Sequence, residues 1–196
     1  DKASYVLKQN NIFFVFTTPL SSNHPAAKYI SKRGDGVRDV AFRVGCDEEA
    51  HDSCESRGAV SVTLPTVTED KNGKFGKSSI QTYGDTIHSF IWRPEYKGLW
   101  APGFEKLKLP DLSSEFPNLI KIDHVVANVE IDKMDHWKEY YENVFGFSTF
   151  VKFDDSNTFL IIDSANISPI SGTPPITKIV FFIGIFSISK IVASKH

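Results

Sequence analysis

The sequence predicts an α+β fold assembled from β-α-β-β-β units, and three observations lead to this class. Residues 37–44 (VRDVAFRV) alternate and are rich in β-branched side chains, which is typical of a strand. Asp47 can then cap a helix running to about residue 56, because the acidic residues that follow it favour a first helical turn. The same order of strand, helix, glycine and strand recurs after residue 119, which indicates an internal duplication at the level of structure.

The other elements of the first unit follow from periodicity and turn residues. Two apolar segments flank the polar KQNN and predict an antiparallel hairpin of residues 3–7 and 12–17. A weak helix is expected over residues 24–32, ending at a turn that contains Gly34. Further strands, each preceded by a glycine-containing turn, are expected at residues 59–64, 78–83 and 86–93.

A second unit is expected to begin near Leu119. Residues 105–118 hold two prolines and several charges without sustained periodicity, which is typical of an interdomain linker. Beyond this linker, residues 121–129 (KIDHVVANV) predict a strand, residues 134–144 a helix ended by Gly146, and residues 147–153 another strand. We therefore divide the chain into a first domain (1–104), the linker (105–118), the start of a second domain (119–155) and a tail (156–196).

The tail differs in composition from the rest of the chain. It carries four charged residues against 42 in residues 1–155, and ten isoleucines against eight. Its apolar run, residues 179–189 (IVFFIGIFSIS), is too short for a helix across the ~30 Å hydrocarbon core of a bilayer unless flanking residues are included. An apolar strand, a membrane segment and sequence foreign to the fold are the alternatives, and we favour the last as a hypothesis.

The charge balance argues against a nucleic-acid partner. Lys plus Arg (22) against Asp plus Glu (24) gives a net charge of −2, without the basic block that phosphate contacts require. Cys46 and Cys54 are the two cysteines, too few for a disulfide framework or a cysteine-rich zinc site. Two free thiols indicate a reducing compartment, so we expect a cytoplasmic protein without a membrane partner.

Several segments together carry a more specific signal than composition. They are YVLKQNNIFFVFTTPL, RGDGVRDVAFRV, SRGA, QTYGDTIHSFIWR, YKGLWAPGFE, KIDHVVANV and YYENVFGF, in this order within residues 1–155. These segments resemble the 4-hydroxyphenylpyruvate dioxygenase family of the vicinal oxygen chelate superfamily. The resemblance implies a two-domain arrangement of β-α-β-β-β modules that is only partly represented here, with the first module truncated.

The resemblance further implies an Fe(II) dioxygenase of tyrosine and phenylalanine catabolism. Such an enzyme converts 4-hydroxyphenylpyruvate and O2 into homogentisate and CO2. Two histidines and one glutamate hold one iron in each full-length subunit. The N-terminal domain of the family is structural and often mediates assembly, so a homodimer is expected for the full-length protein.

His124 is the metal-ligand candidate, because the family's first iron ligand matches the histidine of KIDHVVANV. On a strand, His124, Val126 and Asn128 would share one face, which makes Val126 and Asn128 weaker candidates for substrate contact. The other two ligands are expected in strands that resemble QHIAL and LEIIQR, and neither motif occurs in this sequence. A single histidine does not hold Fe(II) usefully, so we expect this chain alone to be inactive.

The first unit repeats the layout of the family's ligand strands with different residues. GVRDVAF is laid out like GVQHIAL, with Asp39 at the histidine position, and TIHSFIWR carries Ser89 at the glutamate position. One carboxylate beside a serine makes a poor iron site, so no metal is expected there. His88 should face away from Ser89 and be structural, whereas His51 and His136 are expected to be solvated.

Three alternatives stay open for the function. The first is a portion of the dioxygenase, or of a hydroxymandelate synthase, which uses the same substrate and iron ligands. The second is a non-catalytic vicinal-oxygen-chelate module that binds a ligand or partner, favoured by the missing ligand pair. The third is a tail-anchored form of that module, which rests on residues 176–193 alone.

Overall fold

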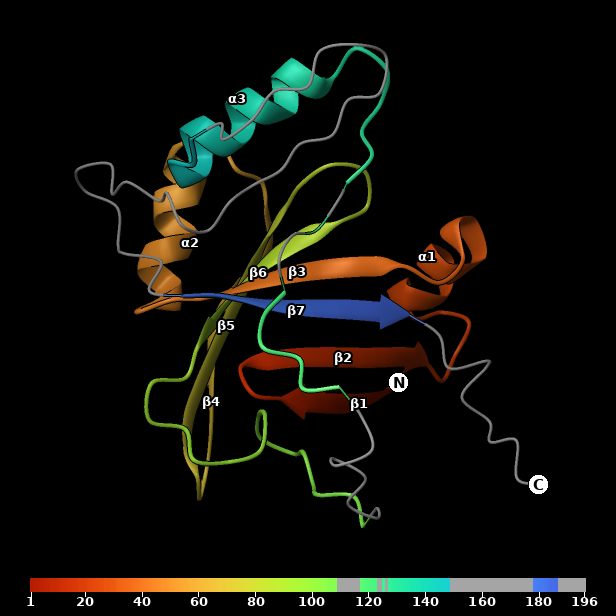
Figure 1. Ribbon diagram of the computed structural model, residues 1–196, viewed down its shortest axis with the longest axis vertical. Coiled ribbons are helices and arrows are strands. Elements are labelled where there is room, and N and C mark those ends of the chain that lie inside the picture. The colour runs from red at the N-terminus through yellow and green to blue at the C-terminus, as the bar shows by residue number, and fades with distance from the viewer. Residues whose placement is uncertain (109–116, 123–124, 126, 149–177, 187–196) are drawn as a thin grey trace.

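In the computed structural model, the chain is arranged around one mixed β-sheet with helices against it (Figure 1). The structure describes residues 1–108, 117–122, 125, 127–148 and 178–186, the last range for its backbone only. The strands are β1 (Lys2–Gln9), β2 (Ile12–Pro19), β3 (Val37–Arg43), β4 (Ser61–Asp70), β5 (Gly73–Gln81), β6 (Ile87–Trp92) and β7 (Lys178–Phe186). The helices are α1 (Pro25–Arg33), α2 (Asp47–Ser56) and α3 (Met134–Phe145).

The predicted hairpin is confirmed as β1 and β2, which pair antiparallel from Lys2 with Pro19 to Gln9 with Ile12. Asn10 takes a positive φ of 53° in the turn, a conformation that asparagine tolerates better than most residues. The Asn10 side chain also donates to the carbonyl of Leu119 at 2.7 Å. It also donates to Asn118 Oδ1 at 2.8 Å, so the hairpin turn holds the junction between the predicted linker and the predicted second domain.

The predicted strand-helix-strand-strand-strand order is confirmed by β3, α2, β4, β5 and β6. β3 pairs parallel with β6, and β5 pairs antiparallel with both β6 and β4. β4 and β5 are longer than predicted, because the turn at residues 71–72 lets their polar ends keep pairing as far as Asp70 with Gly73. Hydrogen bonds between the two strands thus extend them into polar sequence beyond their apolar segments.

Asp47 begins α2 instead of capping it, which corrects the prediction. Cys46 is the cap residue, and its side chain makes no capping hydrogen bond. The Asp47 side chain is buried, and burial raises its pKa. It lies against Gly76 of β5, where an added Cβ would stand 2.5 Å from Asp47 Oδ1. The carboxylate therefore occupies space that only a glycine leaves open.

β7 lies between β2 and β3, so the sheet order is β1-β2-β7-β3-β6-β5-β4 (Figure 1). It pairs parallel with β2 and antiparallel with β3. The sheet therefore contains two parallel pairs, β2 with β7 and β3 with β6, on either side of the antiparallel contact between β7 and β3. Of the alternatives for the tail, the structure shows an apolar strand for residues 178–186.

No helix in the described part of the chain is long and apolar enough to cross a membrane.

Alternating residues of the central strands separate the interior into two clusters. Val40, Phe42 and Phe90 lie on the face covered by α2 and α3, whereas Ala41 and Ile91 lie on the other face. The first cluster holds residues of β3, α2, β5, β6 and α3. The second gathers residues of β2, β3, β5 and β6 with Tyr96 and Trp100.

The helix of the predicted second unit packs on the first unit. Tyr141, Val144 and Phe145 of α3 are buried in the same cluster as Ala50 and Cys54 of α2, and Figure 1 shows the two helices near one another. Gly146 ends α3 in the left-handed conformation, with φ 71°. The expected linker at residues 105–118 therefore does not separate α3 from the first unit, because the apolar face of α3 is covered by the first unit.

The predicted strand over residues 121–129 is not found among its described residues, which adopt no regular secondary structure. A strand needs a hydrogen-bonded neighbour, and no described segment pairs with this one. Of the next predicted strand, residues 147–148 are not in a strand and residues 149–153 lie outside the described residues.

We expect Phe90→Ala to lower the free energy of unfolding by about 3–5 kcal/mol, because the ring is 1% exposed and its loss leaves a cavity. Urea unfolding at neutral pH measures this change. Leu64→Ala is the control, since this leucine is 67% exposed, and it should stay within about 0.5 kcal/mol of the unsubstituted chain. Equal losses in the two variants would contradict this packing.

Candidate functional site

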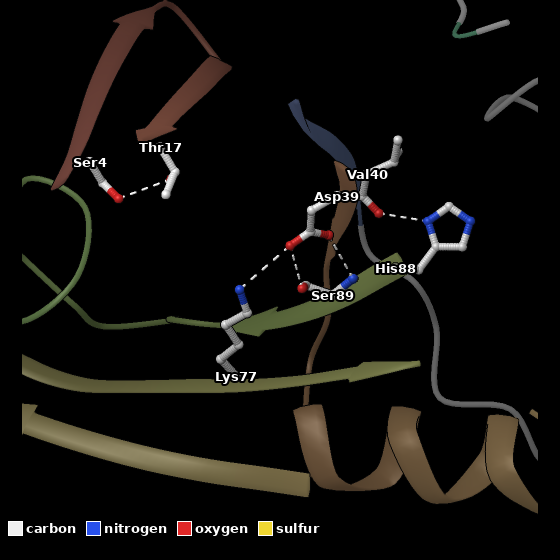
Figure 2. Close-up of polar contacts among 7 residues, drawn as sticks. All are labelled: Ser4, Thr17, Asp39, Val40, Lys77, His88 and Ser89. Carbon is white, nitrogen blue, oxygen red and sulfur yellow. Dashed lines mark hydrogen bonds and ion pairs between the residues drawn. The ribbon is translucent and has the colours of Figure 1, made fainter. Parts of the chain in front are cut away.

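Asp39 of β3 and Ser89 of β6 meet side by side (Figure 2). Asp39 lines a cavity together with Ala41 and Ile91, which belong to the sheet face opposite α2 and α3. The Ser89 hydroxyl donates to Asp39 Oδ2 at 2.6 Å, and the Ser89 backbone N–H donates to Asp39 Oδ1 at 3.1 Å. The ammonium group of Lys77, on β5, lies 3.5 Å from Asp39 Oδ2. The layout of the two ligand-like strands is thus reproduced in space, with Asp39 and Ser89 side by side.

These contacts stand where the backbone pairing of β3 with β6 is interrupted. The register pairs Asp39 with Ile87 and resumes at Phe42 with Phe90, skipping Val40 and Ala41. In the gap, the Asp39 carboxylate accepts the Ser89 N–H, and the carbonyl of Val40 accepts a hydrogen bond from the His88 side chain. Side chains therefore satisfy backbone groups that the strand pairing leaves unpaired.

His88 is structural and faces away from Ser89, as predicted. Its Nδ1 lies 2.7 Å from the Val40 carbonyl, and its Nε2 lies 2.8 Å from the Tyr141 hydroxyl of α3. A carbonyl only accepts, so Nδ1 carries the hydrogen and Nε2 accepts from the tyrosine. Burial lowers the pKa of His88 to about 4 and raises that of Tyr141 well above its ordinary value. Both groups thus stay neutral near pH 7.

A cavity of about 520 Å³ opens beside Asp39. Its described wall combines polar groups, among them Lys77, with apolar side chains that include Phe75 and Trp100. Ser4 and Thr17 also line it and share a hydrogen bond of 2.9 Å between their hydroxyls (Figure 2). We call this cavity the cup. Asp39 and Lys77 line it, and the buried Ser89 donates to Asp39.

The cup does not fit an Fe(II) ion. Both Asp39 oxygens already accept hydrogen bonds from Ser89, and the Lys77 ammonium, 3.5 Å from Oδ2, would repel a second cation bound to this carboxylate. Ser89 is fully buried, so its hydroxyl is not available to a solute. The arrangement can hold two strands together and present one ammonium group to the cavity, since the Lys77 side chain is 44% exposed.

The residues predicted for metal and substrate contact are not assembled in the described structure. His124 and Val126 lie outside the described residues. Asn128 is exposed, on a segment without regular secondary structure. These three residues stay predictions.

Two other histidines had been expected in solvent. His136, on α3, is exposed as predicted. The prediction for His51 is wrong: it is 1% exposed. Its ring faces β4, where Nε2 lies 2.8 Å from the Ser61 hydroxyl. The polar composition of α2 hid this contact, although the position three residues before the buried Cys54 shares its inner face.

Comparison with known proteins relates this chain to one group of enzymes. The chain is 34% identical over 171 residues to a 4-hydroxyphenylpyruvate dioxygenase of Coccidioides posadasii, covering 79% of this chain and 43% of the relative. The dioxygenase of Dictyostelium discoideum is 38% identical over 158 residues (78% and 43%), and that of Xenopus tropicalis 36% over 160 residues (79% and 41%). This chain thus spans less than half the length of these relatives. No family model matches it.

A solved structure supports the predicted fold class. A variant of 4-hydroxymandelate synthase from Streptomyces coelicolor superposes with a TM-score of 0.59 at 17% identity, covering 95% of this chain and 51% of the other. That enzyme has the vicinal oxygen chelate fold. At this identity the likeness establishes the fold alone: α+β, with the vicinal oxygen chelate arrangement.

We expect stability to fall on acidification because of His88. Its pKa is lowered from 6.5 to about 4 in the folded chain, so between these pH values the unfolded chain takes up a proton that the folded chain does not. This difference in protonation does not affect stability above pH 6.5, and it lowers the free energy of unfolding by up to about 3 kcal/mol near pH 4. Urea unfolding from pH 7.5 to 4 should show this slope in the unsubstituted chain and in His136→Gln. The slope should be reduced in His88→Gln; parallel curves for all three would contradict the assignment.

Asp39→Asn should lower the free energy of unfolding by about 1–3 kcal/mol, because an amide nitrogen replaces one of the two oxygens that accept from Ser89. Asp35→Asn, at an exposed position on the loop before β3, should change it by less than about 0.5 kcal/mol. Chemical denaturation at neutral pH provides the comparison. An Asp39→Asn variant as stable as Asp35→Asn would show that the contact contributes nothing.

Proposed function

Because this chain is homologous to the 4-hydroxyphenylpyruvate dioxygenases over nearly four fifths of its length, we propose that it is part of such an enzyme. The reaction would convert 4-hydroxyphenylpyruvate and O2 into homogentisate and CO2, within tyrosine and phenylalanine catabolism. The observation that carries this proposal is sequence identity of 33–38% to dioxygenases from fungi, an amoeba and vertebrates.

Within that enzyme, we propose a division of labour between the two predicted domains. The described module of β3, α2, β4, β5 and β6 would be structural, because its ligand-like positions hold Asp39 and Ser89 closed on one another. His124 would be one of three protein ligands to a single Fe(II), which when bound supplies the activation of O2. Val126 and Asn128 are the weaker candidates for substrate contact.

The full ligand set is not found in this chain. Among the described residues, no two histidines converge with a carboxylate, and the sequence carries neither of the two further ligand motifs. We therefore propose that residues 1–196 alone neither turn over 4-hydroxyphenylpyruvate nor bind Fe(II) tightly. A homodimer, formed by the complete enzyme, belongs to the same proposal.

A reducing, cytoplasmic setting is part of the proposal and fits the state of the cysteines. Burial raises the pKa of Cys54 to about 12, so the thiol stays protonated and unreactive. Its sulfur lies 3.8 Å from the carbonyl of Val144 in the interface between α2 and α3. The thiol acts there as a small apolar group and a weak donor.

A second candidate is supported by the cup. A non-catalytic module would keep the fold and a cavity for a ligand, and the described residues include such a cavity beside Lys77. The two candidates differ in one measurable way. Joining the remaining segment of a related dioxygenase would give activity to a portion of the enzyme but not to a non-catalytic module.

A chimera tests the dioxygenase proposal. Residues 1–155 would be joined to the remaining segment of the Dictyostelium discoideum dioxygenase, and homogentisate would be measured by chromatography. We expect turnover in the chimera, and a loss of at least about 1,000-fold in His124→Ala because three ligands are needed to hold the iron. His136→Ala, at an exposed histidine of α3, is the control and should keep full turnover. Undiminished turnover in His124→Ala would contradict the proposed ligand.

A further inference from the structure

Three ionisable side chains gather on α2, outside the cup. His51, Asp52 and Glu55 each offer one ligand atom, and these atoms all lie within 4.8 Å of one another. Glu55 follows Asp52 by three residues and His51 by four, so the helix places its side chain beside both, and His51 Nδ1 lies 3.5 Å from Asp52 Oδ1. Asp52 and Glu55 are exposed, while His51 is 1% exposed.

The His51 ring leaves one nitrogen without a hydrogen-bond partner. Nε2 lies 2.8 Å from the Ser61 hydroxyl. Nδ1 is buried, makes no hydrogen bond and lies 3.5 Å from Asp52 Oδ1, which is beyond ordinary hydrogen-bond length. An unpartnered buried ring nitrogen is costly, and this one faces the cluster of acceptors.

Two carboxylates and an imidazole lie together here, and the tautomer of the ring decides which of its nitrogens accepts. If Nε2 carries the hydrogen and donates to Ser61, Nδ1 is left with a lone pair on the side of Asp52, whose Oδ1 lies 3.5 Å away. A hydrogen bond from the far ring nitrogen is also the device by which proteins orient a metal-binding histidine. A cation between Nδ1 and the carboxylates would satisfy all three groups at once.

The charge of the helix reinforces this preference. Asp47, Glu48 and Glu49 occupy its first turn, and its last turn contains no basic residue. Together with Asp52 and Glu55, these groups create a negative potential that raises the local concentration of cations.

We propose that His51, Asp52 and Glu55 form a binding site for a divalent transition metal of the Zn²⁺ type. One imidazole nitrogen and two carboxylate oxygens are ligands that Zn²⁺ and Co²⁺ accept, with water in the remaining position. The site is distinct from the iron site proposed at His124 and does not depend on it. Metal binding there would tie the middle of α2 to the start of β4 through Ser61.

Cobalt titration of the metal-stripped 196-residue chain tests the proposal. The d–d absorption of bound Co²⁺ would be followed, with Zn²⁺ as the competitor, in Asp52→Asn and Glu55→Gln. Glu49→Gln is the matched control, because it removes an exposed acidic group from the same helix. His124→Ala is included to separate this site from the proposed iron ligand. Circular dichroism would confirm that each variant is folded.

We expect one Co²⁺ per chain, displaced by Zn²⁺, in the unsubstituted chain, Glu49→Gln and His124→Ala. Affinity should fall at least about tenfold in Asp52→Asn and in Glu55→Gln. Binding that persists unchanged in these two variants, or the lack of any stoichiometric binding to the unsubstituted chain, would overturn the proposal. Loss of binding in His124→Ala would do so too. The first two results would leave the dioxygenase proposal untouched, since the chimera tests it separately, whereas the third would assign the bound Co²⁺ to His124.

Discussion

The contact of Asp39 with Ser89 joins β3 to β6 where their backbone pairing is interrupted. A parallel pair with a gap in its register leaves an N–H and a carbonyl without partners, and both would be costly in a buried position. The Asp39 carboxylate accepts from Ser89, and the His88 ring donates to Val40. Neighbouring residues of a strand face opposite sides of the sheet. The Asp39 carboxylate therefore bonds the Ser89 N–H from one face, and the His88 ring bonds the Val40 carbonyl from the other.

This junction also links the two sides of the molecule. On one side, His88 accepts a hydrogen bond from the Tyr141 hydroxyl and so connects the sheet to α3. On the other side, Asp39 borders the cavity, accepts a hydrogen bond from Ser89 and forms an ion pair with Lys77. Asp39 and Ser89, which the sequence places at ligand-like positions, are therefore used for internal bonding, and this supports the proposal that the module is structural.

Much of this arrangement could be predicted from local sequence. The hairpin turn, the order of β3, α2 and β4, and the end of α3 at Gly146 all follow from periodicity and turn residues. The opposite directions of His88 and Ser89 follow from strand alternation alone. The prediction that Asp39 and Ser89 are neighbours needed the comparison of two ligand-like strand layouts, and the structure confirms it.

The predictions that were wrong share a cause. In each case the conformation depends on a contacting residue or strand that is distant in sequence. His51 was expected in solvent because α2 is polar, but its ring is buried beside Ser61 of β4. Residues 121–129 have a strand-like pattern, yet the described ones pair with no other described segment. The place of β7 between β2 and β3 depends on hydrogen bonds to strands more than 130 residues away, as in the pairing of Val37 with Ile185.

The most direct test of the junction is a measurement of hydrogen-bond scalar couplings by NMR on the isotope-labelled chain. We expect the amide nitrogen of Ser89 to couple to the side-chain carboxylate carbon of Asp39, and the His88 ring to be neutral at pH 7 with its hydrogen on Nδ1. A coupling from the Ser89 amide to a backbone carbonyl of β3, or a His88 ring that carries its hydrogen on Nε2, would contradict it.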